Sequence, residues 1–470
     1  MALDVRTVWE VRTAGNVLNG GGWNPSRGGG GSDLSQSDSP AMTSTTLNCS
    51  SNPTLTSTGG GFTEEMVGNV ICVAGTTFFE IVEYTSATEV TIDRSGGVLS
   101  NASGRVGGAS AALGLICAAV PAATAAGSNT IHVKADTYVA GTHFTNRVTP
   151  SNVGHFLNHH LVTGYNTTRG DATVPCVTLD ANDGNFDAVY STKAYWRWEY
   201  LTATGRGAGV PTYAKFGFNA DTSGDYNVFY RCRSTNTGSG GFRAFGNSVF
   251  CVSCEATAFG IVTDAYGFGW GNTGVSGGAY GCYAHDGAGA GFSSWGTYAP
   301  TLLHCIADAA TTHGFHRNAA TISGVVSYSF CTAFGCVGGS GFYTESSTSG
   351  MTLVHNCIAV NNTGFGIGAN SGGKTRTILL GTAFYGNSGG DIDTNTIVQE
   401  VVPRITLTAD PFVDAANGDF RLAASQRQAL GAGWPGAFLS AGALTVWSGY
   451  PDLGAVQQAV RPTSILVEAA

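Results

Sequence analysis

The sequence predicts an all-β chain whose main body is a parallel β-helix, and three observations support this fold class. A Cys-x-Ala or Cys-x-Ser phrase recurs between residues 230 and 383, and a Gly-Phe pair follows the copies. The Phe residues of successive copies lie 23 to 27 residues apart, which is a period typical of solenoids. The repeats lack a 3.6-residue hydrophobic period and are shorter than a propeller blade, which disfavours helical repeats and β-propellers.

Each coil is expected to bury the same three kinds of side chain. The repeated cysteines are Cys232, Cys254, Cys282, Cys305, Cys331 and Cys357. The small residues two positions later are Ser234, Ala256, Ala284, Ala307, Ala333 and Ala359. The aromatic residues are Phe242, Phe268, Phe292, Phe315, Phe342 and Phe365. Because a buried thiol acts as a small hydrophobic group, we expect the cysteines to stack as free thiols rather than to form disulfides.

The first 105 residues are expected to form a separate small module. The alternating, β-branched stretch 7–12 predicts a strand, and the Gly-, Ser- and Asn-rich stretch 24–61 indicates long loops or a weakly structured insertion. Apolar runs at 70–73, 78–84 and 89–93 predict an antiparallel meander. The sequence therefore predicts an N-terminal strand plus a Gly/Ser-rich β-module over residues 1–105.

The rest of the chain divides into a cap, a body and a closing segment. The Ala-rich stretch 110–120 predicts a helix within residues 106–127, which would cover the apolar interior and the strand edges of the first coil. The β-helix itself is expected over residues 128–400, with about ten to eleven coils at this period. Residues 401–470 are expected to form a C-terminal closing segment and tail.

Composition disfavours several classes of partner. The chain has 470 residues and a formal net charge of -9, and it has no Lys/Arg cluster that would follow a phosphate backbone, so we expect no nucleic acid. It has no run of eighteen apolar residues, so we expect no membrane span. The N-terminus lacks the pattern of a Sec-type signal peptide. We expect no cofactor and no bound metal, because Cys251 and Cys254 form the only Cys-x-x-Cys pair and zinc ribbons need a recurring one.

Residues 105–457 resemble the right-handed parallel β-helix proteins of the pectin-lyase-like superfamily. The resemblance rests on Asn129-Thr-Ile-His-Val-Lys with Thr137-Tyr-Val at the first coil, and on Asp410-Pro-Phe-Val-Asp, Asn417-Gly-Asp-Phe-Arg-Leu and Pro451-Asp-Leu-Gly-Ala-Val at the end. It implies a right-handed β-helix. It does not imply one chemistry, because the superfamily contains lyases, hydrolases, adhesins and phage spikes.

The N-terminal region is similar to modules of tailed-phage virion proteins. The similar phrases are Phe62-Thr-Glu-Glu-Met-Val-Gly-Asn-Val-Ile, Phe79-Glu-Ile-Val and Ala87-Thr-Glu-Val-Thr-Ile-Asp-Arg. With no export signal, this resemblance implies a structural virion protein, as a head decoration, fibre or tailspike-like appendage that is assembled in the host cytoplasm. Its expected partners are other virion proteins and a host-surface polysaccharide. A homotrimer suits this class, although the chain has no coiled-coil heptads.

Charged outward side chains suggest where a catalytic site would lie. If Cys and Ala point inward, the residues between and after them point outward, because neighbours in a strand alternate faces. Arg233 would then lie beside Glu255, and His285 beside Asp308, each pair one coil apart. Acid, base and charged groups on one face suit polysaccharide hydrolysis or elimination. The plainer interpretation is a surface ion pair and a polar contact.

An enzymatic function is an alternative hypothesis to a structural role in a virion. The family's lyases bind calcium through clustered Asp and use an Arg or Lys base, and its galacturonases carry an Asn-Thr-Asp run and an Asp-Asp pair. None of these motifs is present. We therefore expect a structural protein first, a polysaccharide lyase or glycoside hydrolase second, and a non-enzymatic glycan-binding adhesin third.

Overall fold

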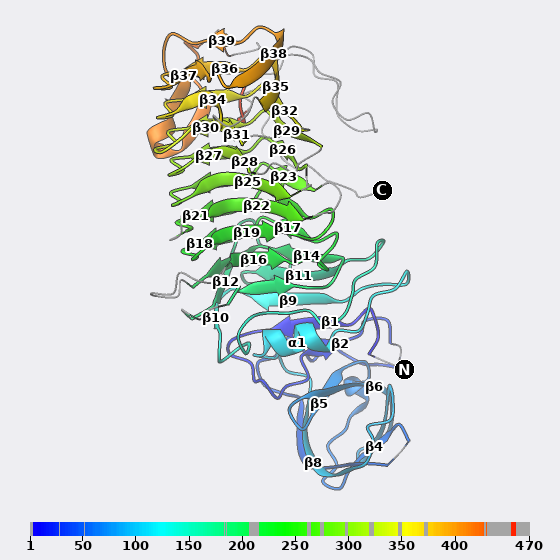
Figure 1. The fold of residues 1–470 in the computed structure, drawn as a ribbon. Coiled ribbons are helices and arrows are strands. Elements are labelled where there is room, and N and C mark those ends of the chain that lie inside the picture. The colour runs from blue at the N-terminus through cyan, green and yellow to red at the C-terminus, as the bar shows by residue number, and fades with distance from the viewer. Residues whose placement is uncertain are drawn as a thin grey trace. The chain divides into compact units, whose positions relative to one another are not determined.

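The computed structural model describes residues 3–27, 29–50, 52–182, 184, 186–205, 216–260, 265–272, 277–296, 299–318, 324–345, 350–370, 375–426, 429 and 453–456. The chain divides into two compact units, Met1–Val249 and Phe250–Ala470. Within each unit, short strands of successive coils pair in parallel and in register, so the predicted parallel β-helix is confirmed (Figure 1). The predicted domain limits at 105, 127 and 400 stay predictions.

The first unit contains a small closed barrel of six antiparallel strands. In spatial order these are β3 (Met42–Cys49), β4 (Thr54–Ser57), β7 (Glu89–Ile92), β6 (Thr77–Ser86), β5 (Val70–Val73) and β8 (Leu99–Val106), with the short helix η1 (Glu64–Met66) between β4 and β5. Leu47, Ile71 and Ile81 belong to its core and are at most 1% exposed. The barrel thus has a hydrophobic core of its own.

The interpretation of residues 24–61 as long loops or a weakly structured insertion was wrong for residues 42–57, whereas the described residues between 24 and 41 form turns and loops. Strands β3 and β4 lie inside that stretch, and β3 alternates buried and exposed residues over most of its length. Its buried residues are Met42, Ser44, Leu47 and Cys49, while Thr43 and Thr45 face water, and β-branched Thr favours the extended backbone of a strand. The Gly- and Ser-rich composition concealed this alternation.

Strand β1 (Val8–Val11) was assigned to the N-terminal module, but it belongs to the β-helix. It pairs in parallel with β9 (Thr130–Lys134) and antiparallel with β2 (Gly22–Trp23). The predicted helix is present as α1 (Leu113–Ala119), which buries Leu113, Ile116 and Cys117. No described helix is long and apolar enough to cross a membrane.

Three sheets build the β-helical part of the first unit. The first contains β2, β1, β9, β11 (His160–Tyr165), β14 (Trp196–Glu199) and β17 (Val228–Tyr230). The second contains β10 (Thr137–Val139), β12 (Val177–Asp180), β15 (Leu201–Thr204) and β18 (Arg233–Thr235). The third contains β13 (Val189–Ser191), β16 (Phe216–Ala220) and β19 (Gly240–Ala244).

The second unit repeats the same three-strand coil. Its first sheet contains β20 (Phe250–Val252), β23 (Gly278–Tyr280), β26 (Thr301–Leu303), β29 (Val325–Ser329), β32 (Met351–His355), β35 (Thr375–Leu380) and β38 (Thr396–Val402). Its second contains β21 (Glu255–Thr257), β24 (Tyr283–His285), β27 (Ile306–Asp308), β30 (Thr332–Phe334), β33 (Ile358–Val360), β36 (Ala383–Tyr385) and β39 (Ile405–Thr406). Its third contains β22 (Tyr266–Asn272), β25 (Ala290–Gly296), β28 (Phe315–Arg317), β31 (Phe342–Thr344), β34 (Phe365–Ala369) and β37 (Gly390–Ile392).

The repeated side chains stack inside the coils. Phe292 lies between Phe268 and Phe315 with ring centroids 4.9 Å from each and planes 7° apart. All twelve cysteines are free thiols, and the thiol of Cys282 donates to the carbonyl of Cys251 at 3.3 Å. The thiols therefore fill space and satisfy backbone carbonyls between coils.

One member of the predicted Phe ladder was wrong. Phe342 pairs with Ile367, not with Phe365, which lies two residues earlier and pairs with Gly390. Ile367 is 2% exposed and takes the inward position, whereas Phe365 is half-buried. The spacing of Gly-Phe pairs could not show this shift, because an aliphatic residue fills the same volume in that coil.

Candidate functional site

The candidate site lies on the second sheet of the second unit, where three-residue strands end at sharp corners. Ala256, Ala284 and Ala307 are in register at the centres of β21, β24 and β27 and are 0% exposed. The residues on either side of each Ala therefore point outward. Asp286 follows β24 with a φ of 53°, a left-handed conformation that Asp tolerates better than most residues.

His285 lies between two carboxylates. Its Nε2 donates to Oε1 of Glu255 at 3.0 Å, and its Nδ1 lies 2.8 Å from Oδ2 of Asp286. Thr257 Oγ1 is also 3.4 Å from Nδ1. The His285 side chain is 16% exposed, while Glu255 and Asp286 are 33% and 70% exposed. Solvent and a ligand can therefore reach the carboxylates more easily than the imidazole.

Tyr283 joins His285 to a second carboxylate. Its ring stacks on the imidazole with centroids 4.3 Å apart and planes 19° apart. Its hydroxyl donates to Oδ2 of Asp308 at 2.8 Å. Glu255, Asp286 and Thr257 contact His285, and Asp308 contacts Tyr283. The stacked rings of His285 and Tyr283 join these contacts into one group, which we call the acid–imidazole cluster.

The surroundings shift these groups in different ways. Burial lowers the pKa of His285, but the hydrogen bonds and charges of Glu255 and Asp286 outweigh it, so the pKa is raised. Burial raises the pKa of Asp308, although the Tyr283 hydroxyl and the charge of His285 oppose this. Burial and then the bond to Asp308 raise the pKa of Tyr283. The site thus combines an imidazole whose pKa is raised by neighbouring carboxylates with a more buried carboxyl group whose pKa is also raised.

Some of the sequence-predicted site residues come together and others do not. Glu255 and His285 are in direct contact. His285 and Asp308 face each other in register, but among the described residues their side chains hydrogen-bond to other partners. Arg233 lies on β18 of the first unit, opposite Thr202, and its proximity to Glu255 stays a prediction.

Sequence reasoning missed Tyr283 and Asp286. Tyr283 lies in the outward row of the repeat, so its direction was predictable, but its hydrogen bond to Asp308 depends on ring geometry. Asp286 lies just outside the Cys-x-Ala phrase. Asn236 and Asn361 occupy the equivalent left-handed corners after β18 and β33. An Asn or Asp directly after the three-residue strand is therefore a sequence pattern that could have identified the Asp286 corner.

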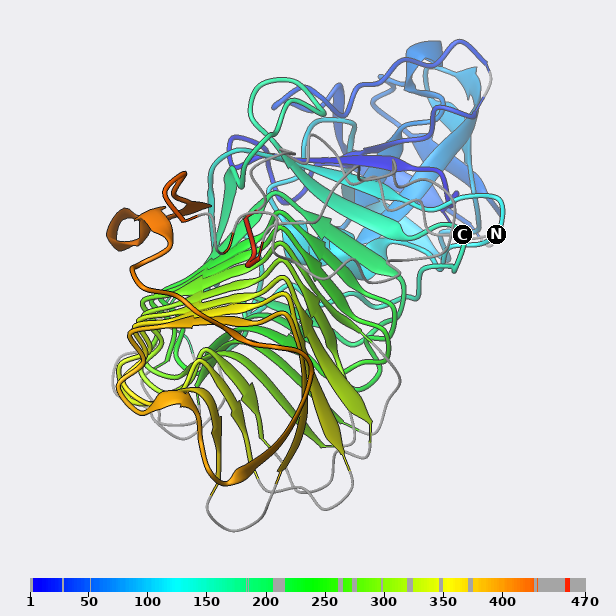
Figure 2. The same cartoon turned by 90° about the horizontal axis from the view of Figure 1, so that it is seen from above.

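The C-terminal segment covers the rest of this outward face. Strand β40 (Phe412–Asp414), helix η2 (Ala415–Asn417) and strand β41 (Asp419–Leu422) lie outside the stacked strands (Figure 2). Phe412, Phe420 and Leu422 form a buried cluster with Ile358 and Val360, against which Tyr283, Ile306 and Phe334 pack. Of the predicted closing segment 401–470, residues 427, 428, 430–452 and 457–470 lie outside the described residues.

The covering segment ends close to the acid–imidazole cluster. The ring centroids of Tyr283 and Phe420 are 6.2 Å apart, at an interplanar angle of 69°. Farther along the sheet, the backbone N–H of Ala455 donates to Oγ1 of Thr332 at 3.0 Å, and Nδ1 of His304 lies 3.1 Å from the Ala455 carbonyl. A ligand that follows this face from Glu255 therefore meets the C-terminal segment beyond Tyr283.

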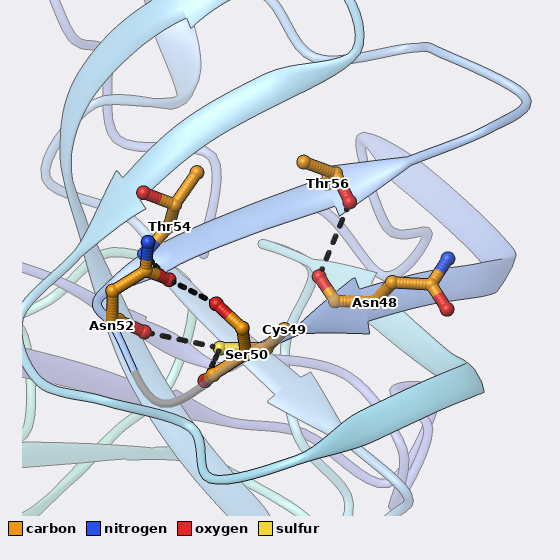
Figure 3. A pocket seen from close by; sticks show the side chains of 6 residues that line it. All are labelled: Asn48, Cys49, Ser50, Asn52, Thr54 and Thr56. Atoms are coloured by element: carbon orange, nitrogen blue, oxygen red, sulfur yellow. Dashed lines mark hydrogen bonds between the residues drawn. The ribbon is translucent and has the colours of Figure 1, made fainter.

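The barrel contains a hollow whose lining has no carboxylate, imidazole or amine side chain. Its lining residues are Asn48, Cys49, Ser50, Asn52, Thr54 and Thr56 (Figure 3). The Ser50 hydroxyl donates to Oδ1 of Asn52 at 2.7 Å, and the Cys49 thiol donates to the Asn52 carbonyl at 3.3 Å. These groups satisfy one another. No described cluster of three or more His, Cys, Asp or Glu side chains could hold a metal ion.

Comparison with known proteins places the fold but not the activity. No family model matches the chain. No curated protein matches it either. A solved pectate lyase, Pel9A, is similar at a TM-score of 0.50 and 16% identity, over 70% of this chain and 88% of the lyase. The catalytic domain of a GH87 α-1,3-glucanase aligns at a TM-score of 0.37 and 10% identity, over 77% of this chain and 90% of that domain.

Proposed function

We propose that the second unit cleaves a polysaccharide at the cluster of Glu255, His285, Asp286 and Asp308. The observation that carries this proposal is the position of His285 between two carboxylates on the outward face of the coils, at 3.0 Å and 2.8 Å. Glycoside hydrolysis needs two carboxyl groups in unlike surroundings, one that gives a proton and one that accepts one. The pectate lyase that shares the fold acts on a polysaccharide and supports the same substrate class.

The roles follow from the surroundings of each carboxyl group. Asp308, whose pKa is raised chiefly by burial, donates a proton to the glycosidic oxygen as the bond from carbon to that oxygen breaks. Glu255, which is one-third exposed, accepts a proton from the water that attacks the same carbon. His285 holds Glu255 by its Nε2–H, and Tyr283 holds Asp308 by its hydroxyl.

The strand spacing favours hydrolysis with inversion at the anomeric carbon. Glu255 is on β21 and Asp308 is on β27, with β24 between them. Two strand spacings, together with an offset of two residues along the strand, separate the backbones of these residues by about 11–12 Å, and their outward side chains span part of that distance. Inverting enzymes hold their two carboxyl groups about 6.5–9.5 Å apart to admit a water, whereas retaining enzymes need about 5–5.5 Å.

A polysaccharide screen with matched variants tests the proposal. The wild-type chain is incubated with a broad panel of capsular, pectic and neutral glycans, and new reducing ends are measured. We expect Glu255→Gln and Asp308→Asn to abolish the activity, while Glu400→Gln, an exposed carboxylate on β38, retains it. Failure to cut any glycan, or full activity in Glu255→Gln, would rule out the cluster as a hydrolytic site.

A second candidate function is that of a virion appendage. The specific observation in its favour is the closed barrel of β3–β8, which has its own core and contains the stretch similar to tailed-phage modules. In this role the barrel attaches to other virion proteins, the chain forms a homotrimer, and the coils contact a host-surface polysaccharide. Mass spectrometry of purified particles tests it, because a virion protein must be present in them.

Binding and cleavage assays distinguish the hydrolase from a non-enzymatic glycan-binding adhesin. A glycan-binding adhesin would retain ligands on a glycan array without releasing new reducing ends. Turnover with loss in Glu255→Gln supports the hydrolase, whether or not the chain is part of a virion. Binding without turnover by the wild-type chain supports the adhesin.

A further inference from the structure

A second polar cluster lies on the outward face of the third sheet in the first unit. Tyr190 on β13, Asn219 on β16 and Arg243 on β19 are in register, so their side chains form one row across three coils. Arg147 joins the row from the preceding loop, with its guanidinium carbon 3.8 Å from the centre of the Tyr190 ring. Neither the acid–imidazole cluster nor the proposed reaction uses these residues.

The guanidinium groups of Arg147 and Arg243 lie over aromatic rings. Arg243 places its guanidinium carbon 3.7 Å from the centre of the Phe245 ring and 5.3 Å from that of Phe216. Such stacking holds a guanidinium by its face and leaves its N–H edges available. Within the part of the chain that the structure describes, neither Arg147 nor Arg243 makes a hydrogen bond or an ion pair.

Asp187 lies near enough to both arginines for their charges to act on it. It is 5% exposed, and burial raises its pKa, while the charges of Arg243 and Arg147 both act in the opposite direction. Its Oδ1 accepts the backbone N–H of Phe216 at 2.8 Å, and its Oδ2 accepts the Nδ2–H of Asn219 at 2.9 Å. Asp187 is therefore occupied, and it fixes the orientation of the Asn219 amide.

Asn219 supplies the observation that points to a ligand. Its side chain is 1% exposed, and its Oδ1 has no hydrogen-bond partner among the described residues. The amide cannot be reversed to remove this deficit, because the atom beside the Asp187 carboxylate must be the donor. A buried carbonyl without a donor costs free energy, and a ligand hydroxyl at this position would recover it.

We propose that Arg147, Arg243 and Asn219 bind a sugar acid. The guanidinium N–H groups donate to the carboxylate, and a neighbouring hydroxyl of the same sugar unit donates to Oδ1 of Asn219. Planar guanidinium groups match a carboxylate in geometry, and the hydroxyl requirement distinguishes a sugar acid from a simple anion. The site binds a glycan and does not cleave it, so it does not depend on the proposed hydrolysis.

Calorimetry of the full chain tests this site. The probes are glucuronate, galacturonate and mannuronate tetrasaccharides, each paired with its carboxyl-reduced form, and acetate serves as the simple anion. We expect at least one uronate to bind, and its reduced form to bind about tenfold more weakly or worse, as expected when charge-assisted hydrogen bonds are lost. No binding by any uronate, or equal binding of the reduced form, would overturn the proposal.

Variants then locate the binding. Arg147→Gln and Arg243→Gln each remove a charge from a side chain that is exposed or half-buried, and each should weaken uronate binding about tenfold. Arg376→Gln, an exposed arginine on β35, should leave it unchanged. Unchanged binding in both Arg147→Gln and Arg243→Gln overturns the site. Calorimetry measures binding and not cleavage, and the Arg147→Gln and Arg243→Gln variants locate that binding, so a failed cleavage assay leaves this proposal standing.

Discussion

His285 donates through Nε2 to Oε1 of Glu255 at 3.0 Å, across two neighbouring coils of the second unit. The register of β21 and β24 places Glu255 opposite Tyr283 and Thr257 opposite His285, so this bond crosses the ladder diagonally. Asp286 holds the other ring nitrogen at 2.8 Å. The imidazole is therefore fixed at both nitrogens, which suits a group that positions a carboxylate.

We expect the stability of the chain to depend on pH through His285. Its pKa is raised in the folded state, so the protonated form contributes stability that is fully present below its unfolded pKa of about 6.5 and is lost as the pH rises through the folded pKa. The substitution His285→Gln should remove this contribution and so flatten the dependence of the urea unfolding midpoint on pH above about 6.5.

The matched control for this prediction is His155→Gln on an exposed turn of the first unit. The part of the pH profile that depends on His285 should persist in this variant. An unchanged profile in His285→Gln would mean that the bonds to Glu255 and Asp286 contribute nothing measurable in solution.

The product of hydrolysis should be the inverted anomer. This prediction follows from the two strand spacings and the two-residue offset between Glu255 and Asp308, about 11–12 Å at the backbone. Proton NMR of the first product formed, before mutarotation, distinguishes the two stereochemical outcomes. A retained anomer would show that the carboxyl groups approach more closely than the strand register allows, and would exclude this pair.

Phe420 should hold the C-terminal segment against the coils. It is 3% exposed and its ring centroid lies 5.6 Å from that of Phe334 and 5.3 Å from that of Phe412. Phe420→Ala should destabilise this contact by about 3–5 kcal/mol, as loss of a buried aromatic side chain usually does. Hydrogen exchange should then increase in β40 and β41, whereas Val413→Ala, at a residue 52% exposed, should change little.

The parts of the fold that sequence could predict are those that repeat. The inward rows of Cys, Ala and Phe follow from the period, because each coil must fill the same volume. The outward contacts do not repeat: Asp286 reaches His285 through a corner, and Phe420 reaches Tyr283 from more than a hundred residues away in the sequence. The Arg147, Asn219 and Arg243 site was also invisible, because its residues come from a loop and two coils with no shared phrase.

The free cysteines give a final prediction about reactivity. Eleven of the twelve thiols are buried, and only Cys176 is partly exposed. Burial, together with the charge of Asp171, raises the pKa of Cys176 to about 11, so little thiolate exists at neutral pH. In the folded chain we expect a thiol reagent such as DTNB to label Cys176 alone, and slowly. All twelve should react at once in denaturant. Rapid labelling of further cysteines without denaturant would show that the stacked thiols between the coils are open to solvent.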